Sequence, residues 1–151
     1  MALIYLTLEQ AIEVHRNTVE VSGGGTLEAL ELGKLDSVLQ NIQNDDYYPT
    51  MEEKLTHLFF CTNKFHCFAD GNKRIAITLC IQMLNFNGYL YCLRQFIQEM
   101  ENISRHVAAG LVDRDLLYEI ISAVLAQEMD SDEELKLKIF HAISQANYSD
   151  E

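Results

Sequence analysis

The chain has 151 residues, 48% of them hydrophobic, so it is long enough for one domain that buries roughly 70% of its unfolded surface. Its 23 acidic and 11 basic residues give a formal net charge of -12, which opposes contact with phosphate backbones and argues against nucleic acid as a partner. No apolar run approaches the roughly 18 residues of a membrane span, and no basic stretch followed by a long apolar core opens the chain, so we expect a cytoplasmic protein without membrane contact.

Helical signals begin close to the start of the chain. Thr7 and Gln10 have the spacing of a capping box, and one helical face then carries Leu8, Ala11, Ile12, His15 and Val19. His15 is therefore expected in the core or at its boundary rather than as a ligand. The run at residues 22–25 breaks the chain, and a second helical region follows with Gly33 as an interruption. Its apolar stripe consists of Leu35, Val38, Leu39 and Ile42.

Two further helices flank a polar run at residues 66–74. Thr50 and Glu53 form a second capping box, and the helix after it has an apolar face of Met51, Leu55, Leu58, Phe59 and Thr62. His57 lies off this stripe and receives no metal role. Beyond the polar run, helical spacing is shown by Ile75, Ala76, Leu79, Cys80 and Met83. Asn87 and Gly88 then form a C-terminal stop.

The second half of the chain also has helical periodicity. Residues 89–93 suit a short extended piece, after which helical spacing resumes with Phe96, Ile97, Met100, Ile103 and Val107. Asp113 is expected to cap the next helix, which turns Leu116, Leu117, Ile120, Ile121, Val124 and Leu125 inward. Ser131 and Glu134 form a third capping box before a stripe of Leu135, Ile139, Phe140 and Ile143. The predicted fold class is all-α.

The most informative stretch is residues 66–74, which read His-Cys-Phe-Ala-Asp-Gly-Asn-Lys-Arg and are called the motif below. The motif falls where a loop leads into a helix. Helix N-termini bind anions because their first backbone N–H groups lack partners and the helix dipole is positive there. Lys64, Lys73 and Arg74 are three of the eleven basic residues and lie within eleven positions. We expect a positive pocket for a nucleotide on an otherwise acidic protein.

The polar residues of the motif each have a chemical use. His66 can take a proton from a hydroxyl at ordinary pH because its reference pKa is about 6.5. Asp70 offers the oxygen ligands that Mg²⁺ prefers, and Gly71 lets a ligand approach the backbone. Asn72 adds donors, and Arg74 has the planar fork that matches phosphate oxygens. A single histidine or an Asp-Gly-Asn turn is usually structural, so only the joint spacing indicates a functional site.

The pattern His-x-Phe-x-Asp-Gly-Asn-Lys-Arg resembles the signature of the Fic/Doc family. Lys73 is similar to the Doc (death-on-curing) branch, because Fic proteins carry a second glycine at this place. Three flanking segments also resemble Doc-like proteins, namely residues 32–39, 48–54 and 85–89. The resemblance covers about the first 125 residues and implies a Fic/Doc-like helical domain at residues 1–128. Residues 129–151 are expected to be a C-terminal helical extension packed on the same domain.

The resemblance assigns a role to each motif position. His66 would be the general base, Phe68 an inward anchor for the loop, and Asp70 the Mg²⁺ ligand. The nucleotide would be bound by Gly71, Asn72, Lys73 and Arg74. The implied reaction is phosphorylation of a protein hydroxyl with Mg-ATP as co-substrate, with transfer of AMP (AMPylation) as the alternative. A noncatalytic interaction or regulatory module with a Fic fold is the alternative of another class.

The resemblance also implies partners and leaves several features open. The substrate would be a protein with a Ser, Thr or Tyr hydroxyl, and an antitoxin or regulatory protein would be a second partner if the chain is the toxin of a toxin–antitoxin pair. In Fic proteins a flap, commonly strand-like, holds the target segment. Residues 44–49 or the loop at 22–26 could supply it here as a short β-hairpin, and the alternative for both segments is an ordinary surface turn. The oligomeric state is left open.

Two further features have alternative interpretations. Some Fic proteins inhibit themselves through a Ser/Thr-x-x-x-Glu helix, a spacing that this chain lacks. The last helix therefore either packs on the domain or makes a regulatory or dimer contact. Cys67 stands where Fic proteins often carry proline and is either a buried structural residue or an oxidant-sensitive thiol beside the base. The four cysteines show no Cys-x-x-Cys spacing, which indicates reduced thiols without zinc.

Overall fold

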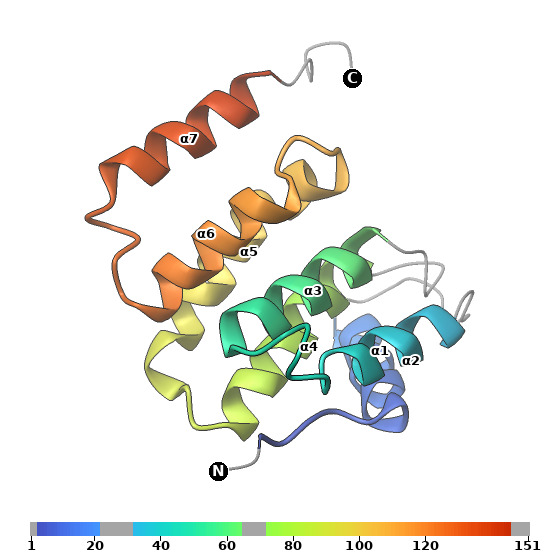
Figure 1. Ribbon diagram of the computed structural model, residues 1–151. Coiled ribbons are helices and arrows are strands. Elements are labelled where there is room, and N and C mark those ends of the chain that lie inside the picture. The colour runs from blue at the N-terminus through green and yellow to red at the C-terminus, as the bar shows by residue number, and fades with distance from the viewer. Residues whose placement is uncertain (1–2, 22–31, 65–71, 146–151) are drawn as a thin grey trace.

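The computed structural model describes residues 3–21, 32–64 and 72–145. These residues form seven α-helices, one short 3₁₀-helix and no strand, so the all-α prediction is confirmed for them (Figure 1). No helix in this part of the chain is both long enough and apolar enough to cross a bilayer. The helices are α1 (Leu8–Val21), α2 (Leu32–Asn41), α3 (Met51–Lys64), α4 (Asn72–Phe86), α5 (Leu93–Ala108), α6 (Arg114–Leu125) and α7 (Glu133–Ser144), with the 3₁₀-helix η1 (Leu90–Cys92) before α5.

Helix α1 begins with the predicted capping box. The backbone N–H of Gln10 donates to Thr7 Oγ1 at 3.1 Å, and the Thr7 N–H donates to Gln10 Oε1 at 2.9 Å. This reciprocal pair satisfies donors that the first helical turn would otherwise leave open. Ala11 and His15 on the predicted inner face are buried, so the expectation of a core or boundary histidine is confirmed.

Helix α3 lies at the centre of the bundle and contacts α2, α4, α5 and α6. The predicted stripes of the three helices α2, α3 and α4 are buried: Leu35, Val38, Leu39, Ile42, Met51, Leu55, Leu58, Phe59, Thr62, Ile75, Ala76, Leu79, Cys80 and Met83. The interruption predicted at Gly33 is wrong. Gly33 lies inside the first turn of α2, where the cost of a single glycine is small because α2 is held by its buried stripe.

The turn before α3 is fixed by hydrogen bonds. The Tyr48 N–H donates to the Asn44 carbonyl at 2.9 Å, and the Asp46 N–H donates to Asn44 Oδ1 at 2.9 Å. The Lys54 ammonium, which is 1% exposed, donates to the Ile42 carbonyl and to Asp45 Oδ1, both at 2.7 Å. Residues 44–49 therefore form turns, which confirms the surface-turn alternative for this segment rather than a β-hairpin flap. The alternative flap at residues 22–26 lies outside the described residues.

Helix α4 ends at the predicted stop. Gly88 adopts a φ of +85°, a left-handed conformation that glycine takes without strain, and the Tyr89 N–H donates to the Leu84 carbonyl at 2.9 Å. The Asn87 side chain then pairs with the backbone of Ile4, accepting from its N–H at 2.8 Å and donating to its carbonyl at 2.9 Å. This pair holds the start of the chain against the end of α4.

The extended piece predicted at residues 89–93 is wrong, because Leu90–Cys92 form the 3₁₀-helix η1. The buried Cys92 thiol donates to the Tyr89 carbonyl at 3.6 Å, and the Tyr91 hydroxyl donates to the Leu125 carbonyl at 2.7 Å. One contact within the turn and one to the last residue of α6 therefore hold this segment as a 3₁₀-helix.

Helices α6 and α7 each begin at an aspartate cap. Asp113 accepts from the Leu116 N–H at 2.8 Å, as predicted, whereas Asp132 rather than Ser131 caps α7 by accepting from the Leu135 N–H at 3.0 Å. The Ser131 hydroxyl is occupied differently, because it donates to the carbonyl of Glu128 at 3.2 Å. The third predicted capping box is therefore wrong, although the helix it announced is present.

Helix α7 lies beyond α6, at the end of the molecule opposite α1 and α2 (Figure 1). Leu135 is buried, and Lys138 pairs with Glu119 of α6 at 2.9 Å. Phe140 belongs to the predicted apolar stripe but is 71% exposed, so the stripe is buried only in part. The division of the chain at residues 128 and 129 stays a prediction.

Candidate functional site

The motif joins α3 to α4. Helix α3 ends at Lys64 and helix α4 begins at Asn72. Six motif residues lie outside the described part of the chain, so the roles given to them stay predictions: His66, Cys67, Phe68, Ala69, Asp70 and Gly71. The structure describes α3, which ends two positions before the motif, and α4, whose first three residues are the last three of the motif.

The first turn of α4 has the properties of an anion-binding helix end. Asn72 is the first residue of the helix, and the next two residues, Lys73 and Arg74, are exposed. The turn holds no acidic residue, although acidic residues outnumber basic ones twofold in the whole chain. Ile75 and Ala76 are fully buried directly after it. The core therefore fixes a helix N-terminus whose first N–H groups have no partner within the helix, and these groups and two exposed cations are suited to an anion.

The last turn of α3 is held by a hydrogen bond to α5 and by a contact between two side chains of α3 itself. The Asn63 side-chain amide donates to the Ser104 carbonyl of α5 at 3.0 Å, and the Lys64 ammonium lies 5.1 Å from the centre of the Phe60 ring. Thr62 Oγ1 and Asn63 Oδ1 are buried without a hydrogen-bond partner among the described residues. Both oxygens are able to accept a hydrogen bond, and both residues lie within four positions of the start of the motif.

A second arginine contacts the same end of α3. Arg114, the first residue of α6, donates from Nη1 to His57 Nδ1 at 2.9 Å and from Nη2 to Cys61 Sγ at 3.6 Å. Its guanidinium carbon lies 4.8 Å from the centre of the Phe60 ring, and the Tyr48 ring stacks on His57 at 4.5 Å. Arginine has no acceptor, so Nδ1 must accept and the imidazole proton must sit on Nε2.

The surroundings keep both titratable groups of this cluster neutral. Burial, assisted by the positive charge of Arg114, lowers the pKa of His57 to about 4. Burial raises the pKa of the Cys61 thiol, although the Arg114 hydrogen bond and charge oppose that effect. Sequence reasoning missed this cluster. The spacing of His57, Phe60 and Cys61 places them on one helical face, but nothing in the sequence links that face to a residue on α6.

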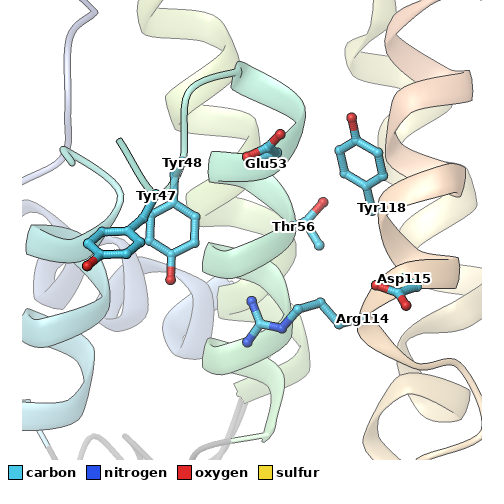
Figure 2. A pocket seen from close by; sticks show the side chains of 7 residues that line it. All are labelled: Tyr47, Tyr48, Glu53, Thr56, Arg114, Asp115 and Tyr118. Carbon is cyan, nitrogen blue, oxygen red and sulfur yellow. The ribbon is translucent and has the colours of Figure 1, made fainter. Parts of the chain in front are cut away.

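Two cavities lie on either side of the His57–Arg114 contact. The first, of about 250 Å³, crosses α3 between the 44–49 turn and α6 (Figure 2) and is lined by Tyr47, Tyr48, Glu53, Thr56, Arg114, Asp115 and Tyr118. The second, of about 260 Å³, lies between α2 and α3 and is lined by Gly33, Lys34, Ser37, Val38, Asn41, His57 and Cys61. Neither lining includes a described residue of the motif.

The described residues include histidines, acidic residues and three of the four cysteines. They contain no group of three or more His, Cys, Asp or Glu side chains that could hold a metal ion. Three of the four cysteines, Cys61, Cys80 and Cys92, are free and buried. The Mg²⁺ ligand predicted from the motif, Asp70, lies outside the described part of the chain.

Comparison with known protein families identifies the group to which the chain belongs. The family model described as the Fic/DOC family matches residues 5–84, a range that includes the whole motif and runs from the segment before α1 nearly to the end of α4. No curated protein and no solved structure matches the chain. Members of this family generally transfer nucleotide-derived groups to proteins. Because the match covers more than half of the 151 residues, the chain belongs to the Fic/DOC family.

Proposed function

We propose that this protein is a Doc-like transferase that uses Mg-ATP to phosphorylate a hydroxyl of a target protein. The observation that supports this proposal most is the first turn of α4, where Lys73 and Arg74, the last two residues of the motif, are exposed in a turn without acidic residues. The rest of the protein is strongly acidic, so this helix end is suited to hold the phosphates of a nucleotide.

The proposed reaction is an in-line phosphoryl transfer. His66 takes the proton of a Ser, Thr or Tyr hydroxyl, and the hydroxyl oxygen forms a bond to the γ-phosphorus of ATP. The bond between the γ-phosphorus and the bridging oxygen breaks, and ADP leaves with that electron pair. The products are a phosphoester on the target and a protonated His66, which returns its proton to solvent.

The other motif residues bind the nucleotide. Arg74 donates a planar pair of N–H groups to phosphate oxygens, and Lys73, Asn72 and the backbone at Gly71 add further donors. Asp70 would hold Mg²⁺, which when bound would neutralise phosphate charge. The usual ligands of Mg²⁺ at such sites are one or two carboxylates, phosphate oxygens and waters. Phe68 anchors the loop inward, so that these groups keep their relative positions.

Lys73 favours phosphate transfer over AMP transfer. A glycine at this position leaves the backbone open, and the α- and β-phosphates can then settle at the helix N-terminus with the α-phosphorus facing the base. A lysine crowds that space and adds a cation, which favours a pose that presents the γ-phosphorus. AMP transfer, in which pyrophosphate leaves, is the second candidate, because Lys73 is exposed and its side chain can also extend into solvent.

The proposal includes partners of two kinds. The substrate is a protein with an accessible Ser, Thr or Tyr hydroxyl. An antitoxin or regulatory protein would restrain the activity if the chain is the toxin of a toxin–antitoxin pair, since the chain contains no Ser/Thr-x-x-x-Glu sequence. A Fic-fold module that binds partners without catalysis is the candidate of another class, and intact His66, Asp70, Asn72 and Arg74 favour the enzyme.

ATP labelled separately at the α and γ positions tests the proposal. The purified protein is incubated with a cell lysate, Mg²⁺ and either label, and labelled proteins are separated on a gel. Label on a target from γ-labelled ATP only is the expected result. Label from α-labelled ATP only would establish AMP transfer instead. If no protein is labelled by either form of ATP, both with Mg²⁺ present and with Mg²⁺ removed by a chelator, the result would favour the noncatalytic module.

A further inference from the structure

We infer that Arg114 is a positioning residue for the transfer reaction, because it fixes the last two turns of α3 from which the chain enters the motif. The inference rests on the proposed function for its catalytic consequence. Its structural basis is independent of that function, since it consists of contacts between described residues of α3 and α6.

The three contacts of Arg114 lie on one face of α3. His57, Phe60 and Cys61 are spaced i, i+3 and i+4, so one guanidinium spans a full helical turn. The last of them stands five positions before His66 in the sequence. A shift or rotation of this turn would therefore be passed to the first residue of the motif over a short stretch of chain.

An arginine suits these contacts better than a lysine. The guanidinium is planar, so it can donate in its plane to His57 and Cys61 while its face lies against Phe60. His57 is neutral at this position, which makes it an acceptor for a cation rather than a repelling charge. A lysine ammonium would be a single point charge on a flexible stem and could not make the three contacts together.

The backbone of Arg114 is itself fixed. It is the first residue of α6, and the preceding Asp113 caps that helix through the Leu116 N–H. The buried faces of α6 hold the helix in the core, with Leu117 and Ile120 fully buried. The Arg114 side chain is thus anchored on α6 through its backbone and contacts α3 through its guanidinium.

The positioning contacts come from outside the part of the chain that the family model matches. Arg114 lies on α6, and the Ser104 carbonyl that accepts from Asn63 lies on α5, whereas the match ends at residue 84. The C-terminal half of this chain therefore supports the end of α3 from two directions. Both supports lie outside the matched range, residues 5–84.

Loss of the Arg114 contacts should change the chemical step more than nucleotide binding. The proposed base, His66, follows α3, whereas the cations at the proposed phosphate site, Lys73 and Arg74, belong to α4. A small displacement of a reacting group lowers the rate strongly, while contacts made equally in the ground state and the transition state affect KM. Displacement of the α3 end should therefore lower kcat and leave KM for ATP nearly unchanged.

Kinetics of Arg114→Ala test the inference. With γ-labelled ATP and the labelled target band of the lysate assay, kcat should fall about 10- to 100-fold, with KM for ATP within about threefold of wild type. Arg94→Ala, which removes an exposed arginine of α5, is the matched control and should leave both constants unchanged. Arg74→Ala should give the opposite split, with a raised KM. A folded Arg114→Ala protein with wild-type kcat would overturn the inference.

Two further measurements keep the test decisive. Millimolar guanidinium should restore part of the activity of Arg114→Ala, because Arg114 lines an open cavity through which the small cation can enter, whereas equal sodium chloride should not. If Arg114→Ala does not fold, Arg114→Lys replaces it and should also show a lowered kcat. Wild-type kcat in Arg114→Lys would refute the role of the planar contacts.

Amide hydrogen exchange separates failure of this inference from failure of the proposed function. If wild type labels no target, the proposed function fails, and the positioning role is judged by exchange alone. The amides of residues 60–64 should exchange at least about tenfold faster in Arg114→Ala than in wild type, because local opening no longer breaks the α6 contacts. Equal exchange rates would show that Arg114 does not hold this turn.

Discussion

The stability of the protein should depend on the protonation of His57. This imidazole is 7% exposed, accepts a hydrogen bond from Arg114 and has its pKa lowered to about 4 by burial and by that positive charge. An unfolded chain returns the histidine to its ordinary pKa of about 6.5. As the pH falls, the unfolded state therefore takes up the proton first, and folding loses stability.

The size of the effect follows from the two pKa values. The contribution of His57 is fully present above pH 6.5 and is lost progressively as the pH falls from 6.5 toward 4. Between pH 8 and pH 5 the loss amounts to about 2 kcal/mol, because at pH 5 the unfolded state is almost fully protonated and the folded state is not. A loss of this size is a large fraction of the stability of an ordinary domain.

Urea denaturation of wild type and His57→Asn at pH 8 and pH 5 measures this contribution. The asparagine carbonyl offers Arg114 an acceptor near the place of Nδ1 but does not titrate. Subtracting the pH dependence of the variant from that of wild type cancels the other titrating groups and should leave about 2 kcal/mol. Equal pH dependence in the two proteins, or an NMR titration of His57 near pH 6.5, would refute the proposed Arg114–His57 arrangement.

Three other outcomes are expected. Asp70→Ala should abolish Mg²⁺-dependent ATP binding, and Arg74→Ala should weaken it about tenfold or more because a charge-assisted contact is lost. If calorimetry shows unchanged Mg-ATP affinity in both variants, the proposed nucleotide site is contradicted. Lys73→Gly should raise the amount of AMP transferred relative to the amount of phosphate, as measured with α- and γ-labelled ATP. An unchanged product and rate would show that this position does not decide the reaction. Deletion of residues 131–151 should not increase transfer by a folded protein, because the chain has no inhibitory Ser/Thr-x-x-x-Glu helix, and a strongly activated truncation would disprove this.

The helices could be predicted where short-range chemistry decides the structure. Thr7 with Gln10, Asp113, and Gly88 mark helix ends through hydrogen bonds or backbone conformations within a few residues, and each of these marks is confirmed. The periodicity of the apolar residues identified the buried faces for a similar reason, since a helix turns side chains four positions apart to the same side.

The errors in the fold arise where neighbouring residues compete or where distant groups decide. Ser131 and Asp132 can both cap a helix, and the serine hydroxyl is bound to the Glu128 carbonyl, which leaves the aspartate as the cap. The 3₁₀-helix at Leu90–Cys92 depends in part on the Leu125 carbonyl, which is far away in the sequence. No local pattern contains that information.

The candidate site shows the same division. The motif is contiguous, so its chemistry could be inferred from the sequence, and the family match over residues 5–84 includes it. The Arg114–His57 contact joins residues 57 positions apart, and the buried Lys54 ammonium depends on the turn that presents Ile42 and Asp45. A lysine or a histidine in a helix gives no sign of such partners until the chain has folded.

The most direct test of the account compares wild type with His66→Ala in transfer from γ-labelled ATP to the target. If His66 is the general base, the variant should transfer phosphate roughly 10²- to 10⁴-fold more slowly, the usual effect of removing such a group. Its circular dichroism and its Mg-ATP affinity should match those of wild type, because the proposed phosphate contacts belong to other residues. A folded His66→Ala protein that labels the target at the wild-type rate would contradict the proposed mechanism.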